Sequence, residues 1–253
     1  MFDLSGEVAV ITGGNGGIGL GMAEGLVAAG ADVCIWGRDE AKNEAAAKQL
    51  QAVAPDVHVE ALRCDVGDES QVVASFARTV ELMGKVDSMF VNAGVGGWSP
   101  FPQMSLDEWR RVLAVNLDGA FLSLREASRH MVERGEGGSL VAVSSVSAIH
   151  GAPNQEHYAA SKAALLAIMR GLAVELARHN IRCNSVLPGW TDTDMLAPGK
   201  ANEKFVEATI RRTPLRRWGV PADLGPVAVF LASREAGFHT GDELVVDGGY
   251  SRF

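Results

Sequence analysis

Two side chains that could move a proton, those of Tyr158 and Lys162, lie four residues apart in the sequence. On a helix, positions i and i+4 share one face, so the phenol would lie beside the ammonium group. A free tyrosine has a pKa of about 10, and a nearby cation lowers this pKa because it favours the phenolate. The pair is therefore a candidate general acid and base near neutral pH. Ser145 follows an apolar stretch at 139–143, and its hydroxyl could hold a substrate oxygen at the same point.

The segments around these residues alternate between short apolar stretches and helical patterns. The apolar stretches predict strands, and they lie at 7–12, 32–36, 57–62, 86–91, 139–143, 181–187 and 243–246. Alternation without a linker or repeat predicts an α/β fold, a single domain over 1–253 with one doubly wound parallel sheet of about seven strands and helices on both faces. Ligands of such sheets bind at the carboxyl ends of the strands. The residues that fall at such ends are the turn 13–19, Arg38, Asp65, Asn92, Ser145 and Pro188–Gly189.

A glycine-rich turn joins the apolar stretch 7–12 to a helical segment at 20–29, which is expected to end at Gly30. Glycines permit a tight turn and let the backbone approach a pyrophosphate, while the helix N-terminus offers free N–H groups. Strand, glycine turn and helix in this order predict a dinucleotide site, with a ligand-free glycine connection as the alternative. Two spacings fit, namely Gly14, Gly16 and Gly19 as G-x-G-x-x-G, or Thr12, Gly13, Gly17 and Gly19 as T-G-x-x-x-G-x-G.

The end of the second predicted strand is the expected place of an adenine ribose. An acidic residue there binds the 2′-hydroxyl, whereas an arginine accommodates a 2′-phosphate. Gly37 takes the place of the acid and Arg38 follows it, while Asp39 is better explained as the N-cap of a helix at 41–53. The sequence therefore favours NADP(H) over NAD(H).

Three helical segments carry further expectations. Ser105 and Glu108 are spaced as a capping box before a long helix that runs towards Glu133 and holds the polar Asn116 among apolar residues. The helix expected at 156–178 is apolar nearly all round, which predicts burial against its own sheet and also against a partner subunit. The segment 190–212 shows no strand pattern, and it predicts a loop with a short helix that serves as a substrate lid or as an ordinary excursion.

Composition and charge exclude several classes of function. The net charge of −8 argues against a nucleic-acid or anionic-membrane surface, and no apolar run reaches the length of about 18 residues that a membrane span needs. The N-terminal stretch lacks the basic region of a signal peptide. The three cysteines, Cys34, Cys64 and Cys183, are far apart, so we expect buried free thiols in a reducing cytoplasm, with no metal site.

Taken together, these motifs resemble those of the short-chain dehydrogenase/reductase family, in its compact form of about 250 residues such as the 3-oxoacyl-ACP reductases. The resemblance covers nearly the whole chain. It rests on Thr12-Gly13-x-x-x-Gly17-Ile18-Gly19, Asp65-Val66, Asn92-Ala93-Gly94, Asn116, Ser145, Tyr158-x-x-x-Lys162, Pro188-Gly189 and Val246-Asp247-Gly248-Gly249. It implies a Rossmann-type fold and favours the spacing through Gly13, Gly17 and Gly19.

The resemblance also implies a role for each matching residue. Tyr158 would transfer the proton, and Lys162 would lower the pKa of Tyr158 and hold the nicotinamide ribose. Ser145 would bind the substrate oxygen, and Asn116 would position a water in a proton relay. Asp65 and Val66 would contact adenine. The other residues implied to bind the cofactor are Asn15, Ile18, Asn92, Ala93, Gly94, Pro188, Gly189, Thr191 and Thr193.

Three positions depart from the family pattern. Val91 replaces an asparagine that often precedes Asn92, and Thr191 stands where a branched aliphatic residue is common. Gly16 stands where NADP-preferring members often carry a basic residue in the glycine turn. Arg38 is therefore left as the sole predicted partner of a 2′-phosphate.

The leading hypothesis is an NAD(P)-dependent oxidoreductase that interconverts a secondary alcohol and a ketone, acting as a homotetramer. Two alternatives are a catalytically silent cofactor-binding scaffold and a serine hydrolase that uses Ser145 with His150 or His157. The hydrolase lacks a G-x-S-x-G elbow, and both histidines are interpreted as loop residues near the pocket mouth. The predicted pocket wall is mostly apolar and consists of Val95, Trp98, Ser147, His150, Trp190, Met195 and Leu196. Such a wall favours a neutral, medium-sized ketone as substrate, either cyclic, aromatic or β-keto acyl.

Overall fold

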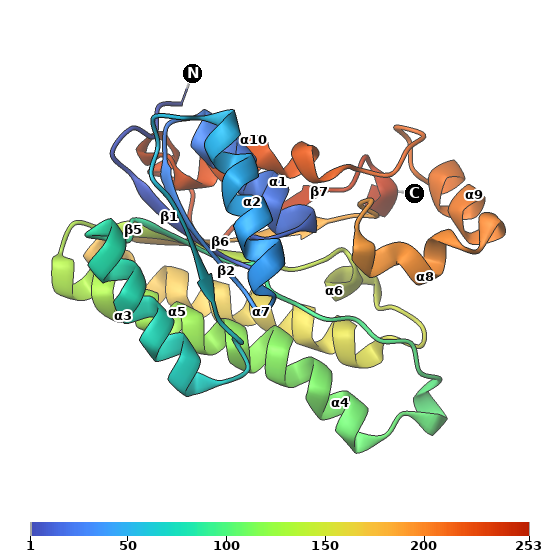
Figure 1. Cartoon of the computed structure of the whole chain (residues 1–253). Helices are drawn as coiled ribbons and strands as arrows, with labels where there is room; N and C mark the ends of the chain where they lie inside the picture. Colours follow the sequence, from blue (N-terminus) through green and yellow to red (C-terminus); the bar gives the residue numbers. More distant parts are fainter. Residues whose placement is uncertain (1, 253) are drawn as a thin grey trace.

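The computed structural model describes residues 2–252, and all seven of its strands lie in one parallel sheet (Figure 1). The strand order is β3-β2-β1-β4-β5-β6-β7. The strands are β1 (Val8–Thr12), β2 (Asp32–Gly37), β3 (Val59–Arg63), β4 (Ser88–Val91), β5 (Gly138–Val143), β6 (Ile181–Pro188) and β7 (Glu243–Val246). The predicted doubly wound parallel sheet is confirmed.

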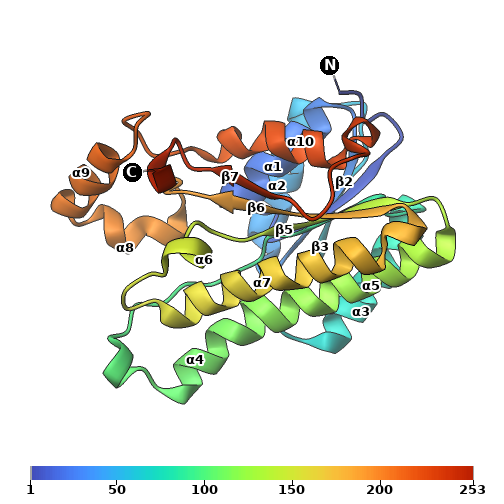
Figure 2. The same cartoon turned by 180° about the vertical axis from the view of Figure 1, so that it is seen from behind.

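Helices cover both faces of the sheet (Figures 1 and 2). One face carries α1 (Gly17–Ala28), α2 (Glu40–Val53) and α10 (Gly225–Ala232). The other carries α3 (Glu69–Met83), α5 (Gly119–Arg134) and α7 (Glu156–Glu175). Alternate strand residues serve the two cores, because successive side chains of a strand point to opposite faces. In β1, Ala9 and Ile11 belong to the core on the face of α1, whereas Val10 belongs to the core on the face of α5.

The direction of winding reverses between β1 and β4. Strand β1 pairs with β2 on one side and with β4 on the other, so the connections on its two sides lead to opposite edges of the sheet. A crevice forms outside the carboxyl ends of the strands at such a reversal. The sheet therefore places the turn after β1 next to the residues that follow β4.

Local sequence signals account for several helix ends. As expected, Asp39 is an N-cap and accepts a hydrogen bond from the backbone of Lys42. Asp68 is also an N-cap, and it accepts bonds from the backbones of Ser70 and Gln71. Gly30 follows α1 with a φ of 95°, the left-handed conformation typical of a helix end.

The long helix expected around Asn116 is instead three elements. Helix α4 (Leu106–Leu113) ends in a π-helical turn at Ala114–Asp118, and α5 then continues to Arg134. Ser105 caps α4 through a bond from the Glu108 backbone. The Glu108 carboxylate, however, does not return to the cap, because it pairs with Arg111 and His157. Only half of the predicted capping box is therefore present.

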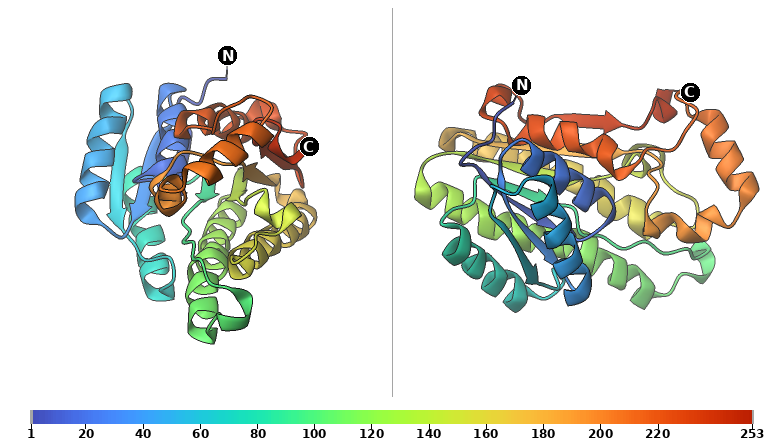
Figure 3. Two further views of the ribbon diagram at one scale, coloured as in Figure 1. Left: turned by 90° about the vertical axis from the view of Figure 1, so that its right-hand side faces the viewer. Right: turned by 45° about the horizontal axis from the view of Figure 1, so that its top comes forward.

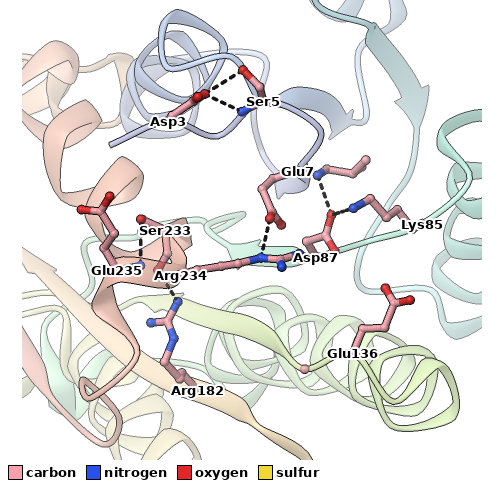
Figure 4. A network of polar contacts seen from close by, with 12 residues as sticks. Asp3, Ser5, Glu7, Lys85, Asp87, Glu136, Arg182, Ser233, Arg234 and Glu235 are labelled. Atoms are coloured by element: carbon pink, nitrogen blue, oxygen red, sulfur yellow. Dashed lines mark hydrogen bonds and ion pairs between the residues drawn. The ribbon is translucent and has the colours of Figure 1, made fainter. Parts of the chain in front are cut away.

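A network of charges ties the amino ends of the strands together (Figure 4). Asp87, 5% exposed, accepts a hydrogen bond of 2.8 Å from the Val8 backbone and pairs with Lys85 and Arg134. Glu7 pairs with Arg234 across the same end of the molecule. These contacts lie at the end of the sheet opposite to the crevice, so we assign them to stability.

The segment expected as a lid forms two short helices, α8 (Ala197–Lys200) and α9 (Glu203–Arg212). They lie at the end of the molecule that also holds the C-terminus and α6 (Ser147–His150), as Figure 3 shows from two further directions. The Trp190 ring anchors this segment, since its centroid lies 5.0 Å from that of Phe205 and 6.5 Å from that of Trp218.

The three cysteines are free and buried, as predicted. Within residues 2–252, no helix is long and apolar enough to cross a membrane.

Candidate active site

Tyr158 and Lys162 lie on one face of α7, one turn apart, as their spacing predicts. The Lys162 ammonium is 5.7 Å from the centroid of the Tyr158 ring. Lys162 is only 3% exposed, and its Nζ donates a hydrogen bond of 2.8 Å to the Val143 carbonyl at the end of β5. The adjacent Ser144 hydroxyl donates to the Lys162 carbonyl, so the strand end holds the lysine at both its side chain and its backbone.

Desolvation dominates the electrostatics of this pair. Burial lowers the pKa of Lys162 to about 8. Burial also raises the pKa of Tyr158, and a hydrogen bond with Ser145 lowers that pKa in part. In the protein alone, desolvation therefore outweighs the lowering of the tyrosine pKa that was expected from the ammonium. The reason is that Nζ is directed to the Val143 carbonyl while the phenol loses its hydration.

Asn116 fixes the loop after β4 through the π-helical turn. Its side chain, 1% exposed, accepts a bond of 2.8 Å from the Val95 backbone and donates 3.1 Å bonds to the Val95 carbonyl and to the Ser161 hydroxyl. Ser161 in turn donates to the Tyr158 carbonyl. Asn116 therefore has the satisfied hydrogen bonds of a buried asparagine and also joins the loop to the tyrosine helix.

The ends of β1 and β4 are bonded to each other. The Thr12 hydroxyl accepts 3.0 Å bonds from the backbones of Asn92 and Ala93. The Asn92 side chain donates to the carbonyls of Thr12 and Gly13. The glycine turn is thereby held against the residues that follow β4.

The backbone decides between the two glycine spacings. Gly13 and Gly17 have φ values of 65° and 51°, which disfavour other residues. A Cβ atom on Gly19 would meet the Gly13 carbonyl and Asn92, whereas one on Gly16 would meet nothing within 4 Å. Gly14, which only the G-x-G-x-x-G spacing uses, has no room for a Cβ atom either, because that atom would lie 2.6 Å from Ile35. All three glycines of the T-G-x-x-x-G-x-G spacing are therefore required, whereas Gly16 of the other spacing is not. Ile18 packs against the core beneath the turn.

The end of β2 has no room for an acidic residue. A Cβ atom on Gly37 would meet the side chains of Asn15 and Asn43, which are joined by a hydrogen bond of 2.7 Å. Asn43, 3% exposed, donates to the carbonyls of Gly37 and Leu62 and so closes the floor of this corner. The sequence analysis missed Asn43, whose place in an alanine-rich helix gave no signal. Arg38 is exposed at the rim, 4.0 Å from Asp65.

The segment after β6 crosses the crevice. Thr191 is buried and pairs with Gly219, and its hydroxyl donates to the Gly189 carbonyl. A Cβ atom on Gly17 would lie 3.2 Å from Thr193, and one on Gly96 would lie 3.8 Å from Met195. The segment therefore approaches both the glycine turn and the loop after β4.

The residues predicted for the pocket wall come from three segments, namely the loop after β4, α6 and the stretch after β6. Ser147 and His150 lie on α6, where His150 is exposed, and Trp98 is 53% exposed. Trp190 packs among aromatic rings, and it lines a cavity of about 180 Å³ with Leu215, Arg217, Asp223 and Asp247. Met195 and Leu196 lie at the start of the lid segment, and Val95 is held by Asn116.

His157 is not the loop residue that was expected, because it lies on α7 and is completely buried. Val66, expected to contact adenine, is 6% exposed, and its side chain packs in the core against Gly119. Any contact of Val66 with adenine would therefore fall to its backbone. Residues 2–252 contain no group of three or more His, Cys, Asp or Glu side chains that could hold a metal ion.

Comparisons with known proteins now identify the family. The model of the family described as enoyl-(acyl carrier protein) reductase matches residues 13–251. The L-rhamnose 1-dehydrogenase (NAD(P)(+)) of Sphingomonas sp. (strain SKA58) is 39% identical, with 97% of this chain and 96% of that protein covered. The chain belongs to the short-chain dehydrogenase/reductase family.

Solved structures agree with this assignment. A short-chain type dehydrogenase/reductase from Mycobacterium marinum has a TM-score of 0.93 and 34% identity, covering 99% of this chain and 97% of that one. A gluconate 5-dehydrogenase from Burkholderia cenocepacia J2315, in complex with NADP and tartrate, has a TM-score of 0.94 and 33% identity, covering 100% and 98%. The chain is thus an NAD(P)-dependent oxidoreductase of the short-chain dehydrogenase/reductase family.

The buried lysine predicts a specific pH dependence of stability. The pKa of Lys162 is about 8 in the folded protein and about 10.5 when exposed, so the unfolded chain binds more protons between these values. The contribution of Lys162 to the free energy of unfolding therefore rises with pH through this window. The free energy of unfolding of wild type minus that of Lys162→Met should rise by about 1–3 kcal/mol between pH 7 and pH 10. Urea unfolding at each pH measures this difference.

The matched control is Lys48→Met, which replaces an exposed lysine of α2. The difference in the free energy of unfolding between Lys48→Met and wild type should not vary with pH. A Lys162→Met difference that is equally constant would show that Lys162 titrates normally.

Proposed function

We propose that the chain interconverts a secondary alcohol and a ketone, with Tyr158 as the general acid and base and NADP(H) as the preferred cofactor. The observation that carries this proposal is the arrangement of Ser145, Tyr158 and Lys162. The half-buried Tyr158 ring lies 5.7 Å from the buried Lys162 ammonium, and the Ser145 hydroxyl favours the ionised phenol, since it lowers the pKa of Tyr158.

The turn after β1 fits a dinucleotide pyrophosphate. Gly13 and Gly17 bring the backbone into a left-handed turn, and the space beside Gly16 is open. The first turn of α1 carries no acidic side chain, so its N–H groups and the positive end of the helix dipole are available to an anion. The nicotinamide cofactor, when bound, supplies or accepts the hydride.

This chain's own residues would handle the proton. Ser145 hydrogen-bonds the substrate oxygen and the phenol, which holds the two oxygens close together. Tyr158 gives its proton to the oxygen as a ketone is reduced, and it takes the proton when an alcohol is oxidised. Lys162 favours the phenolate that this transfer leaves, because an opposite charge stabilises it. Asn116 holds the loop after β4 and the tyrosine helix in one arrangement.

The preference for NADP(H) follows from the corner at the end of β2. Gly37 cannot carry an acid that would bind the ribose hydroxyls, and Arg38 stands exposed beside it to accommodate a 2′-phosphate. The NADP in the related gluconate 5-dehydrogenase supports this preference. The substrate we propose is a neutral, medium-sized ketone or secondary alcohol, with the segment 190–212 as its lid.

The variant Tyr158→Phe tests the role of Tyr158 as general acid and base. This change removes only the proton-transferring oxygen, so kcat should fall by about 100-fold or more on a panel of ketones and alcohols. NADPH affinity should change little. Tyr250→Phe, which alters the only other tyrosine, is the control and should retain activity. Turnover of Tyr158→Phe near the wild-type rate would refute the acid/base role, and cofactor binding without turnover by the wild type would favour a scaffold.

A further prediction concerns cofactor choice. Arg38→Asp replaces an attraction for the 2′-phosphate with a repulsion, so the Kd for NADPH should rise about 10-fold or more while that for NADH changes little. Fluorescence titration with each cofactor measures this. Arg78→Asp, an exposed position on α3, controls for the change in net charge. Equal weakening by both variants, or tighter NADH than NADPH binding in wild type, would contradict the assignment.

We also propose a homotetramer. An apolar row on α7 remains exposed in the single chain, including Ala160, Ala167 and Val174, the last of which is 83% exposed. Burial of this row would complete the two-sided packing expected of α7. Light scattering should give a mass about four times the 26.7 kDa of the chain, and Val174→Glu should lower it. A wild-type monomer would refute the proposal.

A further inference from the structure

The loop after β4, residues 94–99, borders the proposed site, and the structure places none of its residues in a strand. A Cβ atom on Gly94 would lie 3.5 Å from the Lys162 ammonium, and Gly96 is approached by Met195 of the lid segment. The position of this loop must therefore come from its contacts with other elements. Asn116 holds Val95, as described above, and the Ser99 backbone donates to the Asn154 carbonyl.

A second anchor of the loop comes from α4. The Arg111 guanidinium donates a bond of 2.8 Å to the Gly96 carbonyl. It also donates bonds of 2.7 and 2.8 Å to the two oxygens of the Glu108 carboxylate, a bidentate geometry that fixes the orientation of the arginine. Glu108 is therefore the residue that aims Arg111 at the loop.

The same carboxylate contacts the residue immediately before the catalytic tyrosine. His157 is completely buried on α7, and its Nε2 lies 3.3 Å from Glu108 Oε1. A Cβ atom on Gly97 would meet Glu108 and would lie 2.9 Å from His157 Nε2, so the loop backbone rests directly on this contact. One charged cluster thus touches α4, the loop after β4 and the first turn of α7.

The electrostatics of the cluster match this geometry. Hydrogen bonds from Arg111 and then from His157 hold the pKa of Glu108 down to about 2. The carboxylate therefore remains charged throughout the neutral range and can accept all of these bonds at once. Glu108 raises the pKa of Arg111 in return.

We propose that Glu108, Arg111 and His157 act together as positioning residues, which set the loop 94–99 and the first turn of α7 relative to each other. The proposal rests on the proposed function, because the group that it positions is the Tyr158 phenol. The loop faces Lys162 from one side, and α7 carries the phenol on the other. A shift between the two changes the distance from the phenol to any substrate lying against the loop, and a misplacement of about 1 Å can cost about 100-fold in rate.

The test compares Arg111→Met, Glu108→Ala and the double variant with wild type. Arg110→Met makes the same substitution at the neighbouring, exposed position of α4 and serves as the matched control. The readouts are kcat and KM on the best substrate of the panel, the Kd for NADPH, and the midpoint of urea unfolding. A role in positioning affects kcat much more than cofactor affinity.

We expect each single variant to lower kcat by about 10-fold or more, with the NADPH Kd within about 2-fold of wild type. Because the residues act as a unit, the kcat of the double variant should be no lower than that of the more impaired single variant. Glu108→Gln, which still offers an oxygen to Arg111, should recover part of the kcat lost in Glu108→Ala. Arg110→Met should match wild type.

Three results would overturn the proposal. The first is a kcat of Arg111→Met within about 2-fold of wild type. The second is a loss in the double variant equal to the product of the two single losses, since that is the behaviour of independent residues. The third is a fall in kcat only in variants whose unfolding midpoint or NADPH affinity falls in parallel, which marks a general structural role.

If Glu108→Ala fails to fold, Gly97→Ala tests the same contact from the loop side, because its methyl group would displace the cluster. It should lower kcat in the same way. Tyr158→Phe in the same assay separates the two proposals. If kcat falls in Tyr158→Phe but not in the cluster variants, only the positioning proposal is refuted. An active Tyr158→Phe refutes the proposed function.

Discussion

The burial of one ammonium group is the constraint around which the carboxyl end of the sheet is arranged. Lys162 has lost nearly all of its water, and burial of a charge is unfavourable unless it is hydrogen-bonded. The Val143 carbonyl accepts one such bond, and the unfavourable burial of the charge lowers the pKa of Lys162 to about 8. A protein that keeps a lysine in this position gives up stability there, which is typical of functional sites.

The scaffold makes this arrangement possible by joining strand ends that are far apart in sequence. Thr12 and Asn92 bond the ends of β1 and β4 to each other, so the glycine turn is held against the loop after β4. Asn116 then connects that loop to α7 through Ser161. The cofactor corner, the loop and the tyrosine helix are therefore linked by side-chain bonds across the strand order reversal, where parallel sheets bind their ligands.

The sequence was sufficient for the features that depend on local chemistry. Strand and helix alternation predicted the sheet, and residue types predicted the cap at Asp39 and the shared face of Tyr158 and Lys162. It was insufficient wherever long-range contacts decide the outcome. Glu108 has the spacing of a capping box, but His157, 49 residues away, and Arg111 compete for its carboxylate. The raised pKa of Tyr158 likewise depends on burial that spacing alone does not reveal.

The central claim is that Tyr158 is the proton-transferring group beside the nicotinamide, and a direct titration of its phenol tests it. The Tyr250→Phe protein contains Tyr158 as its only tyrosine, so a ¹³C-labelled ring gives one NMR signal to follow with pH. We expect the phenol pKa without cofactor to be higher than that of a free tyrosine, since burial raises it. We expect a lower value with NADP⁺, whose oxidised ring carries a positive charge that favours the phenolate. A phenol pKa that saturating NADP⁺ leaves unchanged would contradict the claim.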